Sequence, residues 1–254
     1  MIRKWLRKAF PNKVNIGCFL VAMLVLIPMV VIGARIMKSL RHYARIVPCH
    51  DHMRKLGAAF AQYTQDNDGF LPARQARNGA NGKLISWRVP INVYVKNPAI
   101  FQCSDNPAIG KNNDVERDGF SRSYAVNSAN DGNRRFGPFA DQFPHGLRMA
   151  KIGSPEGVIM VTETTAAYND INVLLPQAFT KLSSDETKDG SLFAGHQQAA
   201  NVLYCDGHSR FNKTQQLLVG EKDKNPWTID GAPFGPADQS KLKSVLDFAK
   251  KQDW

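Results

Sequence analysis

The sequence predicts an α+β protein in which a long N-terminal transmembrane helix precedes an antiparallel β-sheet domain. Three features support this fold class. An uncharged run covers residues 14–34, helix-type spacing of apolar residues continues to about residue 66, and short apolar segments separated by Gly, Asn, Asp and Pro follow. With 254 residues and a 43% hydrophobic composition, the chain can bury a substantial core.

The uncharged run extends from Val14 to Ala34 and contains only Asn15 as a plainly polar residue. At about 1.5 Å per residue it reaches roughly 30 Å, the thickness of the hydrocarbon core of a bilayer. A secretory signal peptide would have a shorter apolar region and a small-residue cleavage site, which residues 35–37 do not provide. We therefore expect a membrane anchor over residues 14–34, a single-pass membrane protein, and a basic segment over residues 1–13 on one side of the membrane.

The formal net charge of +11 is concentrated at the N-terminus. Residues 1–45 carry nine basic side chains and no acidic one, placed on both sides of the uncharged run. The remainder of the chain is close to neutral, so a nucleic-acid partner is not expected. Because both flanks of the run are similarly basic, charge does not decide the orientation in the membrane.

Helical character continues beyond the uncharged run, over residues 35–68. Apolar residues recur at intervals of three and four between Met53 and Thr64, which predicts one buried face of an amphipathic helix. The helix should stop at the Asp-Asn-Asp-Gly segment of residues 66–69. Pro48 removes a helical N–H and disfavours the α conformation before it, so we expect a kink or a break there.

Residues 69–254 are expected to form a periplasmic or extracellular β-rich domain that ends in a helix. The most convincing strand is residues 157–164, whose apolar side chains suggest burial on both faces. Residues 85–95 suggest one or two extended pieces. Near the C-terminus, an apolar stripe behind Asp238 predicts the final helix.

A β-hairpin is predicted within "GHQQAANVLYCDGHSRF", residues 195–211. Asp206-Gly207 is a strong signal for a two-residue turn, because a type I′ turn needs positive φ at both central positions. Pairing outward from this turn places Cys205 opposite His208, with both side chains on the face away from the core.

Two kinds of chemistry are conceivable at this hairpin. Cys205 and His208 could form a thiolate–imidazole pair of a hydrolase, and His196, Asp206 and His208 could ligate a divalent metal. The first lacks a recognisable oxyanion hole, and the second lacks identifiable further ligands. Asp206 is also well suited to bond its own turn. We therefore expect no enzyme activity and no cofactor, and no small-molecule substrate is identified.

Two other segments could bind a ligand, but each has a simpler structural explanation. Residues 66–69 resemble the start of a calcium loop, but the twelfth position is Arg77 in place of glutamate. Four aromatic side chains could form a sugar platform, although residues so far apart in sequence are more often core anchors. They are Trp87, Trp227, Phe234 and Trp254.

The chain resembles the prepilin-type processing-associated family of planctomycetes and related bacteria. That family is named for a histidine, nine intervening residues and Asp-Gly, here His196, Asp206 and Gly207. Further similar segments occur in the same order over roughly residues 15–212. They are residues 44–72, 86–89 ("SWRV"), 100–108 ("IFQCSDNPA"), 123–127 ("SYAVN") and 151–163 ("KIGSPEGVIMVTE").

The resemblance implies a fold like type IV pilins and type II secretion pseudopilins. It implies a structural subunit of a cell-envelope filament or secretion-type assembly, which forms homo- or hetero-oligomers through the N-terminal helix. Such a subunit is anchored in the bacterial inner membrane, with residues 1–13 in the cytoplasm. It also implies a disulfide between Cys49 and Cys103. One departure is informative: after Gly17, the glutamate expected in an assembling pilin is replaced by Ala22. The alternative is a non-assembling envelope-anchored domain that binds a ligand or a metal.

Overall fold

The structure, a computed structural model, describes residues 16–77, 84–106, 119–140, 143, 145–164, 170–171, 173–174, 192–218 and 224–250. The basic segment 1–13, Val14 and Trp254 lie outside these residues. The chain divides into two compact units, Met1–Arg45 and Ile46–Trp254, which are described separately.

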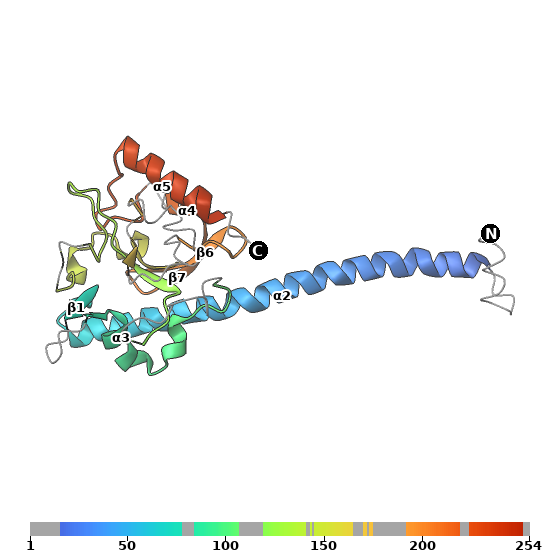
Figure 1. Ribbon diagram of the computed structural model, residues 1–254, viewed down its shortest axis with the longest axis horizontal. Coiled ribbons are helices and arrows are strands. Elements are labelled where there is room, and N and C mark those ends of the chain that lie inside the picture. Colours follow the sequence, from blue (N-terminus) through green and yellow to red (C-terminus); the bar gives the residue numbers. More distant parts are fainter. Residues whose placement is uncertain are drawn as a thin grey trace. The chain divides into compact units, whose positions relative to one another are not determined.

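The first described element is a 51-residue helix, α2 (Ile16–Asp66), drawn in blue in Figure 1. The remaining elements are, in chain order, β1 (Gln75–Arg77), β2 (Leu84–Ser86), α3 (Arg88–Val95), η1 (Pro98–Phe101), β3 (Tyr124–Asn127), η2 (Met149–Lys151), η3 (Pro155–Gly157), β4 (Ile159–Glu163), β5 (Asp170–Ile171), β6 (Ala199–Tyr204), β7 (Ser209–Lys213), α4 (Thr214–Leu218) and α5 (Pro236–Ala249).

Helix α2 does not supply the membrane span predicted for residues 14–34. Across the part of the chain that the structure describes, no helix combines the length and apolarity needed to cross a membrane. The predictions of a transmembrane helix, of a single-pass membrane protein and of an inner-membrane location are therefore wrong.

Helix α2 continues through Pro48, so the break that proline permits there does not occur. It ends at the predicted Asp-Asn-Asp-Gly segment, where Asp68 and Gly69 have φ angles of 52° and 79°. The backbone N–H of Gly69 donates to the carbonyl of Thr64 at 2.8 Å. This left-handed ending provides a partner for a carbonyl that the helix itself leaves without one.

A five-stranded sheet forms the centre of the domain, in the order β5-β3-β4-β6-β7. All its pairings are antiparallel except β3 with β5, and all five residues of β4 are buried. One sheet face packs against the later part of α2, and the other packs against α5 (Figure 1). The predicted α+β class with a largely antiparallel sheet describes this domain, without the transmembrane part.

Residues 88–95 form a helix where extended structure was predicted, whereas residues 85–86 belong to a strand as expected. Strand β2 ends at Ser86, and α3 follows directly. Pro90 lies in the first turn of α3, where a missing N–H costs no hydrogen bond, and Ile91 is fully buried in the core. Burial therefore overrides the β-propensity of the valines in this segment.

The hairpin of β6 and β7 has a three-residue loop in place of the predicted two-residue turn. Leu203 pairs with Ser209, and the N–H of Tyr204 donates to the carbonyl of His208 at 2.9 Å. Only Gly207 in the loop takes a positive φ, of 91°. A turn with one left-handed glycine needs one more residue than a type I′ turn, so Cys205 is not opposite His208.

The hairpin loop meets α2 at a glycine. A Cβ built on Gly57 would lie well inside van der Waals contact of the Gly207 carbonyl oxygen, and 2.9 Å from Leu203 Cδ1. Helix and loop therefore approach backbone to backbone, and this position accepts no side chain.

We expect Gly57→Ala to lower the free energy of unfolding of the domain by about 1–3 kcal/mol, because the added methyl overpacks the contact with Gly207. Chemical denaturation followed by circular dichroism measures the change. Gly153→Ala is the control in the same unit, since a Cβ there meets nothing within 4 Å. An unchanged stability of Gly57→Ala would contradict the close approach.

Candidate functional site

A glutamate side chain lies inside the core at the end of the central strand. Glu163 is the last residue of β4, pairs with Tyr124 of β3 and is 0% exposed. Its carboxylate accepts hydrogen bonds from the backbone N–H of Asn201 at 2.8 Å and from the side-chain amide of Asn201 at 3.2 Å. Burial of a carboxylate costs free energy unless it is hydrogen-bonded and paired, so Glu163 requires specific neighbours.

The histidine of the sequence motif is one of these neighbours. His196 precedes β6 and is fully buried, with its Nε2 atom 3.1 Å from Glu163 Oε1. The N–H of Phe193 donates to the carbonyl of Glu163 at 3.0 Å, which holds the approaching chain beside the end of β4. Gln197 and Gln198 then take φ angles of 56° and 60° as the chain turns into β6. The local backbone therefore points the imidazole at the carboxylate.

A second carboxylate faces the other nitrogen of the same ring. His196 Nδ1 lies 3.5 Å from Asp105 Oδ2, and the Asp105 side chain is 18% exposed. Asp105 follows Cys103 by two residues, in a turn where the N–H of Asn106 donates to the carbonyl of Cys103 at 3.1 Å. The imidazole thus lies between a buried carboxylate and a partly exposed one.

Two cysteines complete this site. Cys49 on α2 and Cys103 after η1 are both fully buried and form a disulfide, with their Cα atoms 5.3 Å apart. They are the pair that the family resemblance implied. Their sequence separation is 54, so on the chain-entropy model the bond stabilises the domain by roughly 4 kcal/mol. Cys103 Sγ lies 3.6 Å from His196 Nε2.

We call Cys49, Cys103, Glu163 and His196 the Cys–His–Glu cluster. One ligand atom from each residue lies within 4.8 Å of the ligand atoms of the other three, and all four residues are buried. The residues come from α2, the segment after η1, the end of β4 and the segment before β6. Sulfur, imidazole nitrogen and carboxylate oxygen are the donor atoms that proteins offer to transition metals.

The two ends of the sequence motif lie at opposite ends of β6. His196 precedes this strand, whereas Asp206 and Gly207 follow it, so the motif spans the strand's length of about 20 Å. The structure therefore does not bring His196 together with Asp206 and His208, so these three residues do not form the metal site considered from the sequence. The nine-residue spacing instead connects the Cys–His–Glu cluster at one end with the α2 contact at the other.

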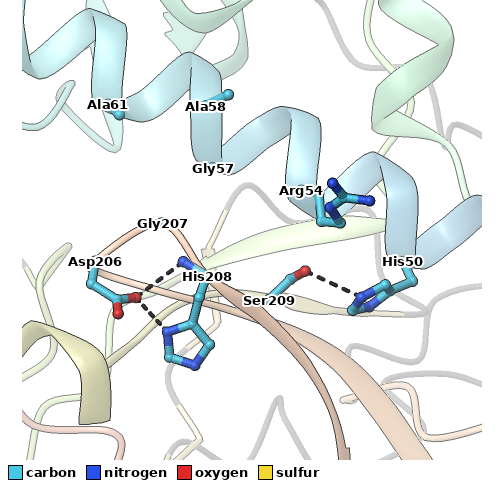
Figure 2. A pocket seen from close by; sticks show the side chains of 9 residues that line it. All are labelled: His50, Arg54, Gly57, Ala58, Ala61, Asp206, Gly207, His208 and Ser209. Carbon is cyan, nitrogen blue, oxygen red and sulfur yellow. Dashed lines mark hydrogen bonds and ion pairs between the residues drawn. The ribbon is translucent and has the colours of Figure 1, made fainter.

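An open groove of about 620 Å³ lies between α2 and the hairpin loop (Figure 2). Asp206 Oδ1 accepts from the backbone N–H of His208 at 3.0 Å and lies 2.5 Å from His208 Nδ1. Across the groove, Ser209 Oγ is 3.5 Å from His50 Nε2. The predicted role of Asp206 in bonding its own turn agrees with these contacts, which use its carboxylate locally.

Cys205 does not form a thiolate–imidazole pair with His208. Its side chain is buried in the core beneath α2, and this burial, reinforced by the charge of Asp206, raises the pKa of the Cys205 thiol. The ring of His208 stacks on Tyr204 at a centroid distance of 4.5 Å, and Tyr204 belongs to the core on the opposite sheet face. The thiol therefore stays protonated and lies away from the imidazole.

The sequence interpretation did not identify Glu163 or Asp105 as site residues. The available signal for Glu163 was a charged residue ending a strand that is otherwise buried on both faces. The aromatic side chains weighed as a sugar platform are core residues instead, since Trp87, Trp227 and Phe234 are each at most 4% exposed.

Comparisons with known proteins returned no matching family model, no matching curated protein and no matching solved structure. The resemblance to the prepilin-type processing-associated family therefore remains a prediction from the motifs. The function has to be argued from the surfaces and the side-chain clusters of the chain itself.

We expect His196→Ala to lower the free energy of unfolding by about 3–5 kcal/mol, because Glu163 stays buried after losing its partner. His208→Ala, at a partly exposed residue, should change it by less than about 1 kcal/mol. Urea denaturation under non-reducing conditions measures both variants. If both variants lost the same free energy of unfolding, the buried contact between His196 and Glu163 would contribute no more to stability than a partly exposed residue does.

Proposed function

We propose that this protein is a structural subunit of a pilin-like or pseudopilin-like filament or secretion-type assembly, which it joins through the first part of α2. The observation that carries the proposal is the bare apolar surface of residues 21–37. The large hydrophobic side chains of this segment are between 42% and 76% exposed. They are Val21, Met23, Leu24, Val25, Leu26, Ile27, Met29, Val30, Val31, Ile32, Ile36 and Met37.

This surface is larger than a chain in water normally leaves uncovered. Burying one such side chain contributes about 1.5–3 kcal/mol, so covering the whole segment yields a large driving force for association. The segment is apolar on all sides, without the polar face of an ordinary surface helix. A helix of this kind needs neighbours all round, which a bundle of several copies provides and a simple dimer does not.

Small residues within the same segment favour close helix packing. Ala22, Gly33 and Ala34 offer little side-chain bulk, and a Cβ on Gly33 would meet nothing within 4 Å. Small interfacial residues let helix backbones approach one another and increase dispersion contacts. Arg35 is the one charged residue within residues 21–37, and it would mark the edge of the fully buried region.

The second unit supports the proposal through its architecture. The later part of α2 packs on a largely antiparallel sheet, which is the arrangement that the family resemblance implies for a pilin-like head domain. The motif residues serve this arrangement, because Gly207 contacts the helix and His196 lies next to the cysteine that the helix carries.

The rival function is a non-assembling domain that binds a ligand or a metal. Ala22, which stands where an assembling pilin has glutamate, favours this rival, whereas the bare apolar segment favours assembly. A hydrolase that uses Cys205 and His208 is the weakest candidate, because the raised pKa of the buried thiol leaves it without a nucleophile at neutral pH.

We expect the purified full chain to form ordered filaments or large oligomers, and Leu24→Lys with Val30→Lys to abolish them. Two lysines buried among apolar helices without partners cost at least about 3 kcal/mol, which raises the dissociation constant about 100-fold or more. Negative-stain electron microscopy and sedimentation velocity report the assembly state.

Val93→Lys is the matched control, since Val93 is a bare apolar residue of α3 with 65% exposure. This variant should assemble like the unmodified chain, and circular dichroism should show that all variants fold. The proposal fails if the unmodified chain sediments as a monomer at high concentration, or if the Val93 substitution disrupts assembly as strongly as the lysines in α2.

A further inference from the structure

We propose that Cys49 and Cys103, when reduced, bind a zinc ion together with His196 and Glu163. The Cys–His–Glu cluster then holds either a disulfide or a metal, and the redox state selects between them. The proposal goes beyond the assembly function and does not depend on it, because all four residues belong to the unit Ile46–Trp254.

The spacing of the ligand atoms is the first argument. Zinc binds thiolate sulfur at about 2.3 Å and nitrogen or carboxylate oxygen at about 2.0–2.2 Å, so neighbouring ligands of a tetrahedral site lie about 3.3–3.8 Å apart. His196 Nε2 already lies 3.1 Å from Glu163 Oε1 and 3.6 Å from Cys103 Sγ. All four ligand atoms lie within 4.8 Å of one another, and reduction of the disulfide lets the two sulfur atoms move apart toward this spacing.

The surroundings of the ligands are the second argument. A metal-bound histidine usually directs its other ring nitrogen at a carboxylate, and a metal-bound carboxylate is usually hydrogen-bonded itself. Here His196 Nδ1 lies 3.5 Å from the Asp105 carboxylate. Glu163 Oε2 accepts from the backbone N–H of Asn201 at 2.8 Å, which leaves Oε1 facing the imidazole. The Asp105 carboxylate thus faces the far side of the imidazole, and Asn201 holds the Glu163 carboxylate by hydrogen bonds.

The chemistry of the ligand set is the third argument. Two thiolates, one imidazole and one carboxylate suit zinc, and four protein ligands make a closed site of the structural kind. The four residues are fully buried, so bulk water would not compete for a position on the metal. A buried carboxylate beside an imidazole has little value for a disulfide alone, but it supplies one charged ligand for a divalent cation.

The two states interconvert by a balanced exchange. A dithiol reductant donates two electrons and two protons to the Cys49–Cys103 bond, which gives two protein thiols and the disulfide of the reductant. Zinc then displaces both thiol protons as the two sulfur atoms bind it. In reverse, zinc leaves, the thiols regain their protons, and exchange with the oxidised reductant restores the protein disulfide and the dithiol.

The test compares zinc binding by the oxidised and the reduced full chain. Reduction uses a water-soluble phosphine, which takes oxygen from water as the disulfide becomes two thiols and which competes weakly for zinc. We expect about one zinc per reduced chain and none per oxidised chain, measured by elemental analysis after gel filtration. Cobalt(II) in place of zinc should give the visible bands of a tetrahedral site and a thiolate charge-transfer band.

Variants separate this site from adventitious binding. We expect His196→Ala to weaken zinc binding by more than 10-fold, and Asp105→Asn to weaken it by about 10–100-fold through loss of the carboxylate behind the ring. Because Asp105 is partly exposed, its variant should fold even if the His196 variant does not. Cys205→Ser and His208→Ala are matched controls outside the cluster and should bind zinc normally.

The proposal is overturned if the reduced chain binds less than one zinc ion per chain. This holds whether zinc is added to the folded reduced chain or is present while the reduced chain refolds. It is equally overturned if the oxidised chain binds zinc as well as the reduced one, or if either control variant abolishes binding. Failure of zinc binding would leave the assembly proposal intact, since assembly is tested at Leu24 and Val30 in the other unit.

Discussion

The backbone-to-backbone contact between Gly57 of α2 and Gly207 of the hairpin loop is the constraint on which the domain depends. A side chain at position 57 would hold the helix away from the sheet and open the core beneath it. With this contact made, the buried face of α2 reaches the sheet, and Cys49 reaches Cys103. The helix is therefore fastened at two points, one near each end of β6.

The second fastening point is unusual in being polar. The core around Glu163 would pack well with apolar residues alone, and replacing a buried charged set by such residues is often neutral or stabilising. Stability therefore does not explain why a carboxylate and an imidazole are kept beside two sulfur atoms. The zinc site proposed above accounts for this combination, because sulfur, imidazole nitrogen and carboxylate oxygen are the donor atoms that zinc binds in proteins.

The two units of the chain pose opposite physical problems. In Ile46–Trp254 the apolar side chains fill two cores on the two faces of one sheet. In Met1–Arg45 the large apolar side chains described from Val21 to Met37 are exposed. The proposed assembly surface and the Cys–His–Glu cluster therefore lie in different units, so each proposal can be tested by substitutions that leave the other site unchanged.

Local sequence patterns determined the end of α2 at residues 66–69, the buried strand β4 and the buried stripe of α5, because side-chain periodicity and turn residues act over a few positions. Tertiary structure decided the rest. The hairpin register follows from a three-residue loop, and α3 follows from burial overriding propensity. The partners of His196 are 33 and 93 residues away, at Glu163 and Cys103, and chain folding alone brings residues so distant into contact. The membrane prediction rested on the composition of residues 14–34, and no helix among the described residues is long and apolar enough to cross a membrane.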